Sequence, residues 1–228
     1  MSIKGRTVDV VDGMTAAITY ELVFIRQEYC FPATRPDPRI IDCGANIGIT
    51  VLYWKHLYPQ SRILAFEADP HIYQVLVRNC GGLPDVEIHN RAVWISSEEL
   101  WFYCEGADGG HLTESPERSQ SGQLCRIQGV RLRDYLDQPI DLLKVDVEGA
   151  EVDVLVDCGD RLRFVDRLFL EYHSFVDRPQ RLDELFRVLR EADFRVHIVA
   201  SEGNPQPFMN RRVHNSKYLH AFLYCFRE

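Results

Sequence analysis

Two segments of this chain share one pattern, and together they constrain the fold more than any other feature. Each is a short apolar run that ends in acidic residues and then passes through glycine into a helical pattern, at residues 39–48 (RIIDCGANIG) and 141–151 (DLLKVDVEGAE). Buried parallel strands read as continuous apolar runs, and their carboxyl ends line the ligand crevice of an open α/β sheet. A glycine turn before a helix also exposes backbone N–H groups to an anionic group. The two segments therefore predict two parallel strands that deliver carboxylates to one binding crevice.

The rest of the chain alternates between strand-like and helix-like patterns, which predicts a doubly wound α/β fold with a mostly parallel sheet. Parallel strands are expected at residues 39–43, 61–67, 86–89, 140–146 and 168–172. Helices are expected at residues 47–57, from Pro70 to a stop at Gly81, and at residues 150–158 and 179–191. The last two strands, at residues 194–199 and 218–226, are expected to form a C-terminal antiparallel hairpin.

Residues 1–38 are expected to form an N-terminal arm or cap. Within it, residues 7–11 suggest a short strand or hairpin, and residues 21–29 suggest a short helix. No internal repeat or linker divides the chain that follows, so residues 39–228 are predicted to be a cofactor-binding domain, with a single globular domain overall.

The composition is that of a soluble globular protein, with 46% hydrophobic and 26% charged residues among 228. No apolar run is long enough to span a membrane, and the N-terminus shows no secretory signal. Seven scattered cysteines without a CxxC pair favour reduced thiols, with four of them as core residues, in a cytoplasmic protein. The net charge of −8 disfavours a nucleic-acid partner. The sequence leaves homo-oligomer formation open.

Three motifs carry a resemblance to a known family. D-x-G-A-N-I-G at residues 42–48, E-A-D-P at residues 67–70 and D-x-x-K-x-D-x-E-G-x-E at residues 141–151 resemble the FkbM-type family of S-adenosylmethionine (SAM) methyltransferases. The similarity extends from about Tyr29 to His173. It implies the seven-stranded methyltransferase sheet, SAM as cofactor, and O-methylation of a hydroxyl on a small molecule such as a sugar, polyketide or similar natural product.

The glycine turn favours SAM over a dinucleotide. A dinucleotide fingerprint would need glycine at positions 44, 46 and 49, but Asn46 and Ile49 occupy two of them. A pyrophosphate needs very close backbone approach, whereas SAM has no phosphate and tolerates a looser turn. Gly44 is expected to give clearance. Asn46 either caps the following helix or contacts the cofactor.

Glu67 ends the second strand, where it is expected to accept hydrogen bonds from two ribose hydroxyls. Asn90 and Ala92 resemble the segment on the adenine side of the family's cofactor. Tyr29 follows Glu28 where the family places a residue pair near the cofactor, although a helix end under the connector explains it equally well. The expected cofactor-binding residues are Tyr29, Asp42, Gly44, Asn46, Glu67, Ala68, Asn90, Ala92 and Asp146.

The expected catalytic residues are Asp146, Glu148 and His173. A buried strand gains nothing from acids at its end, and buried carboxylates are costly without partners, so a cationic ligand is expected beside Asp146 and Glu148. His173 is the best candidate for a general base, because its ordinary pKa is near neutral, although a structural histidine is the alternative. His111 is a weaker candidate for the base. Lys144 is expected to form an ion pair with Glu148, Glu151 or Glu171.

Other interpretations remain open at this stage. Asp146, Glu171 and His173 could form a Mg²⁺ site, but no ligand spacing requires one, so a metal is not favoured. The polar stretch at residues 105–123 is expected to cover the active site and select the substrate. A non-catalytic SAM- or nucleoside-binding regulatory or scaffold protein is the first alternative function. An NAD-dependent reductase is the second.

Overall fold

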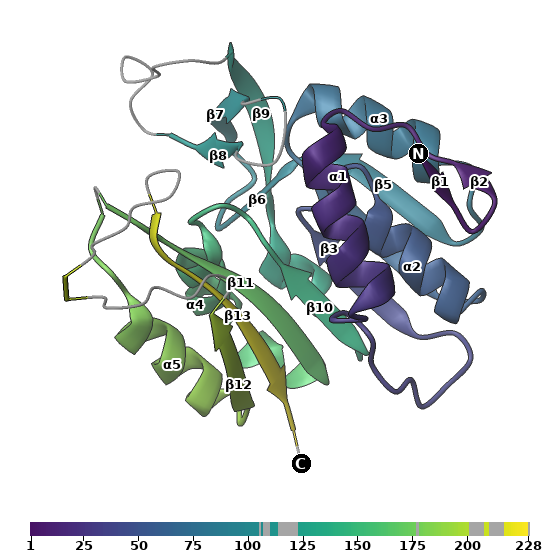
Figure 1. The fold of residues 1–228 in the computed structure, drawn as a ribbon. Helices are drawn as coiled ribbons and strands as arrows, with labels where there is room; N and C mark the ends of the chain where they lie inside the picture. The colour runs from purple at the N-terminus through teal and green to yellow at the C-terminus, as the bar shows by residue number, and fades with distance from the viewer. Residues whose placement is uncertain are drawn as a thin grey trace.

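The computed structural model describes residues 1–104, 106, 110–113, 123–176, 178–200, 208–209 and 217–227. Its centre is a seven-stranded sheet in the order β12-β13-β11-β10-β3-β4-β5 (Figure 1). The strands are β3 Arg39–Cys43, β4 Arg62–Glu67, β5 Val86–Asn90, β10 Leu142–Val145, β11 Arg167–Phe175, β12 Arg195–Ala200 and β13 Lys217–Phe226. The first five pair in parallel, and β13 pairs antiparallel with both β11 and β12. The predicted doubly wound sheet with a C-terminal antiparallel hairpin is confirmed.

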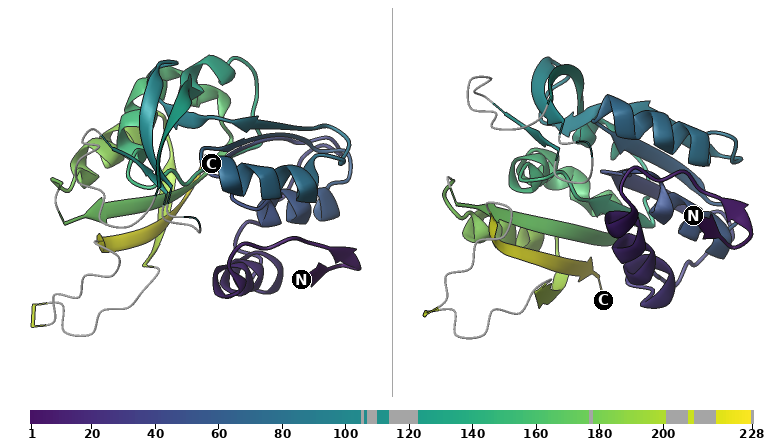
Figure 2. Two further views of the ribbon diagram at one scale, coloured as in Figure 1. Left: turned by 90° about the horizontal axis from the view of Figure 1, so that it is seen from above. Right: turned by 45° about the horizontal axis from the view of Figure 1, so that its top comes forward.

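Helices cover both faces of this sheet (Figures 1 and 2). One face packs against α2 Ile49–Leu57 and α3 Pro70–Cys80, and the other against α4 Glu151–Cys158 and α5 Leu182–Glu191. Strands β3, β4, β10 and β11 are apolar on both sides and contribute to both core clusters, as buried parallel strands must. The helix α3 begins at Pro70, as predicted, and the side chain of Asp69 caps it. Two short helices, η3 Leu132–Tyr135 and η4 Gly159–Phe164, precede β10 and β11.

A smaller sheet, in the order β6-β9-β7-β8, follows β5. Its strands are β6 Ala92–Trp94, β7 Glu99–Cys104, β8 His111–Leu112 and β9 Gln123–Arg131. Strands β7 and β9 pair antiparallel. Of the expected cover at residues 105–123, residues 105, 107–109 and 114–122 lie outside the described part, and β8 pairs with β7.

The N-terminal prediction was partly wrong. The hairpin pairs β1 Ser2–Ile3 with β2 Arg6–Thr7, and the helix begins at Gly13, not at residue 21. The carboxylate of Asp12 accepts the N–H of Thr15 at 2.7 Å and starts α1 Gly13–Tyr20, which continues as the π-helical turn η1 Glu21–Ile25. Four cysteines, at positions 43, 80, 158 and 225, are buried core residues as expected. Among the described residues, no helix is both long and apolar enough to cross a bilayer.

Asn79 joins the arm to the rest of the fold. Its side chain is buried, donates to the carbonyls of Asp9 and Ile47 at 2.9 and 2.8 Å, and accepts the N–H of Asp9 at 2.8 Å. Apolar arm residues share the core cluster of α2 and α3. The boundary between an arm at residues 1–38 and a domain at residues 39–228 stays a prediction, and Asn79 offers a way to test it.

We expect Asn79→Ala to lower the free energy of unfolding by about 2 kcal/mol, because it leaves buried backbone groups without their hydrogen-bond partner. It should also make the arm more sensitive to limited proteolysis. Urea unfolding and proteolysis of the variant measure both effects. Gln74→Ala, which removes an exposed amide from the same helix, is the control. Unchanged stability and proteolysis in Asn79→Ala would contradict this role.

Candidate active site

The carboxyl ends of the parallel strands meet at one edge of the sheet, and the strand order reverses there between β3 and β10. Ligands of open α/β sheets bind at such a reversal, because the neighbouring loops diverge and leave a crevice. The strands bring four acids to this edge: Asp42, Glu67, Asp146 and Glu171. Register places Leu170 beside Val145, so Glu171 and Asp146 come level as the next residues of neighbouring strands.

Gly44 is required by the protein itself. Its φ is +84°, and a Cβ at this position would lie 1.9 Å from the carbonyl oxygen of Asp146. The space that the missing side chain of Gly44 leaves was expected to admit a ligand. It is instead filled by the backbone of Asp146, in the turn that follows β10. The N–H groups of Gly44 and Ala45 both donate to the carbonyl of Phe66, at 3.0 and 2.9 Å. These two groups are therefore not available to an anionic group, contrary to the expectation from the glycine turn.

Asn46 is not the cap of the following helix. The helix α2 begins at Ile49 with Gly48 as its N-cap, and the side chain of Asn46 accepts the N–H of Ile47 at 2.6 Å. Its φ of +49° is unusual for a residue other than glycine and indicates local backbone strain. The N–H of Asn46 donates to Glu67 Oε2 at 2.9 Å, so the turn and the end of β4 are joined through this carboxylate.

Glu67 lies at the end of β4, where the sequence places it. Its Oε1 accepts the N–H of Asp69 at 2.8 Å, so each carboxylate oxygen is oriented by one backbone donor. Burial raises the pKa of Glu67 to about 7, although the two N–H groups act in the opposite direction. The side chain is only half-buried and retains lone pairs for further donors.

The two residues assigned to the adenine side, Asn90 and Ala92, have different surroundings. The amide of Asn90 donates to the carbonyls of Glu67 and Ala68 at 2.9 and 3.0 Å. Ala92 is 3% exposed and packs in the core of the smaller sheet. A cofactor contact of Ala92, which stays a prediction, would therefore have to use its backbone.

Lys144 is held between the two sheet-end acids. Its ammonium lies 3.3 Å from Asp42 Oδ1 and 3.2 Å from Asp146 Oδ2, and it donates to the carbonyl of Gly44 at 2.8 Å. The predicted partners were wrong, because Lys144 lies directly opposite Asp42 in the β3–β10 register. Burial alone would lower the pKa of Lys144, but Asp42 and Asp146 outweigh it and raise this pKa well above its ordinary value.

Asp42 is entirely buried. Its Oδ2 accepts the hydroxyl of Thr50 at 2.5 Å, and its Oδ1 faces Lys144. In this arrangement Asp42 supports Lys144, and its predicted contact with the cofactor stays a prediction. Burial and the nearby Glu171 raise the pKa of Asp146 to about 8. Asp146, unlike Asp42, keeps 24% of its side-chain surface exposed.

Tyr29 lies in the core, in the cluster that contains α2 and α3. It is 7% exposed. The centroid of its ring lies 4.6 Å from the ring centroid of Phe169 and 6.3 Å from that of Trp54. Burial and the charge of Glu171 raise the pKa of its phenol well above the ordinary value. The structure therefore favours the packing interpretation of Tyr29, with its hydroxyl end near the acids.

His173 is buried at the end of β11. Its Nδ1 lies 2.9 Å from Glu151 Oε1, and its Nε2 lies 3.6 Å from Glu148 Oε1. Burial would lower the pKa of His173, but Glu151 and Glu148 raise it well above its ordinary value. Its side chain has no exposed surface, so it cannot reach an acceptor in this arrangement. Burial and charge thus both argue against His173 as a free general base.

Two further residues of this cluster were missed by sequence reasoning as site residues. Glu151 orients His173, and His220 on β13 lies directly opposite His173 and interacts with Glu171. Glu148 reaches His173 from a turn with a φ of +50°, another left-handed residue other than glycine. His111 on β8 comes within 6.1 Å of Phe175, between ring centroids, at the border of the cluster. His220 lies 47 positions after His173 in the sequence, so only the β11–β13 register shows that the two histidines are neighbours.

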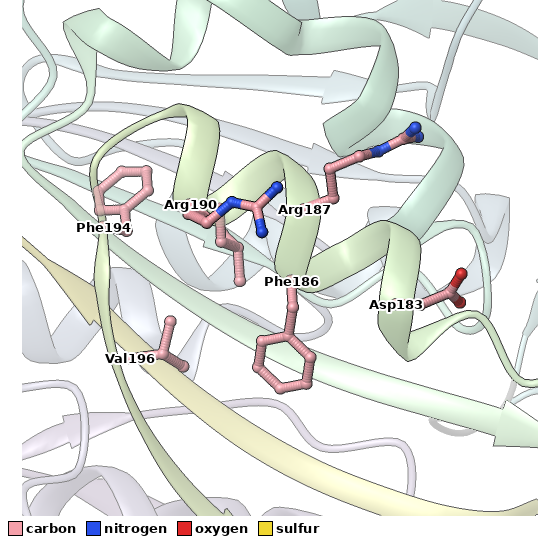
Figure 3. A pocket seen from close by; sticks show the side chains of 7 residues that line it. Asp183, Phe186, Arg187, Arg190, Phe194 and Val196 are labelled. Atoms are coloured by element: carbon pink, nitrogen blue, oxygen red, sulfur yellow. The ribbon is translucent and has the colours of Figure 1, made fainter.

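A pocket of about 340 Å³ lies elsewhere, between α5 and β12 (Figure 3). It is lined by apolar and charged side chains that include Asp183, Phe186, Arg187, Arg190 and Phe194. The first residues of β12 and β11 both pair with Phe226, so this pocket lies at the amino end of the sheet, opposite the acids. It is not part of the candidate site.

The strand order, with β13 antiparallel between β11 and β12, is that of the class I SAM methyltransferase fold. A family model, the methyltransferase FkbM domain, matches residues 42–196. The chain therefore belongs to the FkbM methyltransferase family.

Individual relatives of this chain are also methyltransferases by name. The chain is 32% identical over 180 residues to methyltransferase sdnD of Sordaria araneosa, covering 64% of this chain and 70% of that protein. It is 26% identical over 156 residues to 2-O-methyltransferase NoeI of Sinorhizobium fredii (strain NBRC 101917 / NGR234), covering 60% of this chain and 64% of that protein.

A crystal structure of methyltransferase FkbM from Methylobacillus flagellatus KT is similar with a TM-score of 0.56, at 16% identity. The match covers 91% of this chain and 48% of that one, so this chain spans about half of its length. At this identity the likeness shows the fold alone.

Proposed function

We propose that this chain transfers the methyl group of SAM to a hydroxyl of a small-molecule acceptor. The observation that carries the proposal is the set of acids at the strand reversal: Asp146, Glu148 and Glu171 lie together at the carboxyl edge of β10 and β11. Lys144, which lies beside them, is buried between Asp42 and Asp146. Such an excess of carboxylates suits a cationic ligand, and SAM carries both an ammonium and a sulfonium.

The residues of the crevice suggest a division of roles. Glu67 accepts the two ribose hydroxyls, with Ala68 and Asn90 forming the wall on the adenine side. Asp146 and Glu148 face the cationic part of the cofactor. His173, held by Glu151, is a positioning residue for Glu148 and Glu171. SAM supplies an already activated methyl group when bound, and correct placement of the acceptor accounts for much of the rate of such an in-line transfer.

The proposed acceptor class is supported by the names of relatives and not by a shape in this chain. NoeI is by name a 2-O-methyltransferase, which supports a hydroxyl as the methylated group. We propose a sugar-like or polyketide-like acceptor in natural-product biosynthesis, a cytoplasmic location and no nucleic-acid partner, in keeping with the net charge of −8.

Calorimetric titration of the purified protein with SAM, S-adenosylhomocysteine and NADH in parallel tests the cofactor. We expect the first two to bind and NADH not to bind. Transfer of a labelled methyl group to a panel of sugar and polyketide hydroxyls then tests the reaction. Binding of NADH alone would overturn the proposal in favour of a reductase. Binding of SAM without transfer to any acceptor would favour a regulatory protein.

A further inference from the structure

The buried histidine at the end of β11 has one nitrogen that the fold does not satisfy. His173 is 4% exposed, and its Nε2 makes no hydrogen bond to any residue in the described part of the chain. The nearest carboxylate oxygens to this nitrogen belong to Glu148 and Glu171, at 3.6 and 3.7 Å. A buried polar atom without a hydrogen bond is unusual and calls for a ligand or another explanation.

The other nitrogen of His173 determines which ring nitrogen carries the proton. Glu151 Oε1 lies 2.9 Å from His173 Nδ1 and also accepts the N–H of Gly149 at 2.9 Å. An ionised carboxylate only accepts hydrogen bonds, so Nδ1 carries a proton and donates it. A cation that binds between Nε2 and the carboxylates must displace the second proton of the ring, and Nε2 then offers it a lone pair. A carboxylate that orients a histidine in this way is typical of metal-ligating imidazoles.

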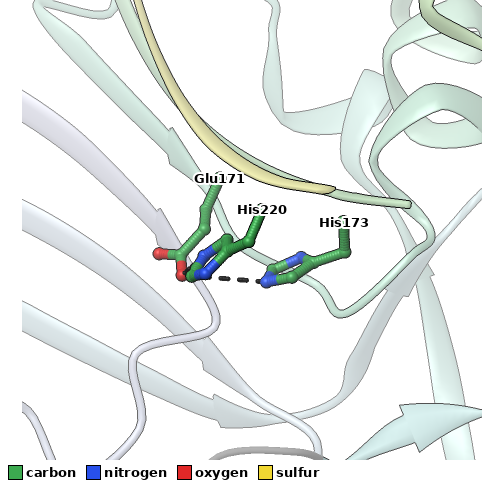
Figure 4. A group of neighbouring side chains, drawn as sticks. All are labelled: Glu171, His173 and His220. Atoms are coloured by element: carbon green, nitrogen blue, oxygen red, sulfur yellow. Dashed lines mark hydrogen bonds and ion pairs between the residues drawn. The ribbon is translucent and has the colours of Figure 1, made fainter. Parts of the chain in front are cut away.

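The sheet register places a second imidazole beside the first. His220 lies directly opposite His173 in the antiparallel β11–β13 pair, and Glu171 is two residues before His173 on the same face. The two rings stack with centroids 4.8 Å apart, and Glu171 interacts with both histidines (Figure 4). Ligand atoms of Glu171, His173 and His220 all lie within 4.8 Å of one another.

We propose that Glu171, His173 and His220 bind a divalent transition-metal ion, with Glu148 as a further ligand. Ligand atoms at about 2.1 Å from one ion are about 3.0–3.4 Å apart, close to the distances between Nε2 of His173 and the two carboxylates. Two imidazole ligands favour Zn²⁺ over Mg²⁺, which prefers oxygen and water, and the carboxylate ligands also suit Mn²⁺. The N–H that His220 directs at Glu171 must lose its proton or move it to Nδ1 when the ion binds.

This site differs from the oxygen-rich set of Asp146, Glu171 and His173. Asp146 lies 3.2 Å from the ammonium of Lys144, so it is not a ligand in the proposed site. His220 takes its place in the ligand set. His220 keeps 31% of its side-chain surface exposed, which leaves one side of the ion open to water or another ligand. If the proposed methyl transfer holds, that open side lies at the same edge of the sheet as the acceptor.

The test uses the full chain after dialysis against a chelator. Calorimetric titration with ZnCl₂, MnCl₂ and MgCl₂ should show one equivalent of Zn²⁺ or Mn²⁺ bound, with Mg²⁺ at least tenfold weaker. His220→Gln and His173→Gln should each weaken binding at least tenfold. His197→Gln, which removes an exposed histidine from the neighbouring β12, is the matched control and should bind as the wild type does.

Thermal unfolding with and without the ion separates a loss of metal binding from a loss of stability in each variant. The bound ion should raise the Tm of the wild type and of His197→Gln but not of His220→Gln. Absence of Zn²⁺ and Mn²⁺ binding, equal binding by His220→Gln, or tighter binding of Mg²⁺ would each overturn the proposal. Titration of the same samples with SAM separates the two hypotheses. SAM binding without metal binding rejects only the metal site, whereas metal binding without SAM binding rejects only the proposed function.

Discussion

Replacing Lys144 with methionine is expected to lower the free energy of unfolding by about 3–5 kcal/mol, the cost of leaving a buried charge unpaired. Lys144 is 3% exposed and lies between Asp42 and Asp146, and Asp42 is completely buried. Methionine preserves approximately the volume of the lysine side chain, but it removes the charge and the hydrogen bond to the Gly44 carbonyl. The remaining carboxylate of Asp42 would then keep only Thr50 as its hydrogen-bond partner among the described residues.

Urea unfolding of Lys144→Met and of the double variant Asp42→Asn/Lys144→Met measures this effect. The double variant should recover a large part of the loss, because it removes the buried charge together with its partner. Arg190→Met, on the last turn of α5 away from the crevice, is a control for the loss of a positive charge. A loss below about 1 kcal/mol in Lys144→Met would show that the buried ion pair does not stabilise the fold.

The second large effect is expected at Glu67. Glu67→Ala should weaken SAM binding by about 100-fold, since it removes two charge-assisted hydrogen bonds of about 1.5 kcal/mol each. Calorimetric titration with SAM measures the change, and thermal unfolding shows whether the turn at Asn46 survives. Glu87→Ala is the control, because it removes an exposed acid from the neighbouring strand β5. Unchanged SAM affinity in Glu67→Ala would exclude the ribose role.

The pH dependence of binding gives an independent check. Burial raises the pKa of Glu67 to about 7, so this carboxyl is mostly protonated at pH 6 and mostly ionised at pH 8. The ionised form accepts both ribose hydroxyls, so SAM affinity should rise about tenfold from pH 6 to pH 8. Glu67→Gln should bind SAM more weakly and should lose this rise. The same rise in Glu67→Gln would assign it to another group.

Much of the fold follows from local patterns that sequence alone carries. The apolar runs at residues 39–43 and 142–145 identify buried parallel strands, and Asp69 with Pro70 marks a helix start, because these signals depend on the chain nearby. The three motifs identified the family, and they placed Glu67 and Asp146 at strand ends before any contact was known. The N-terminal helix was misplaced because the cap at Asp12 was not recognised.

The tertiary structure decided which of these residues face a ligand. Asp42 and Lys144 are a hundred positions apart, and only the β3–β10 register shows that they neutralise each other below the crevice. In the same way, the β11–β13 register brings His220 opposite His173, and the turn after β10 directs Glu148 toward that imidazole. Strand pairing depends on contacts between distant segments, which no local pattern encodes. The sequence therefore determined the family and the acids at the crevice, and the packing of distant strands determined which of them are buried partners.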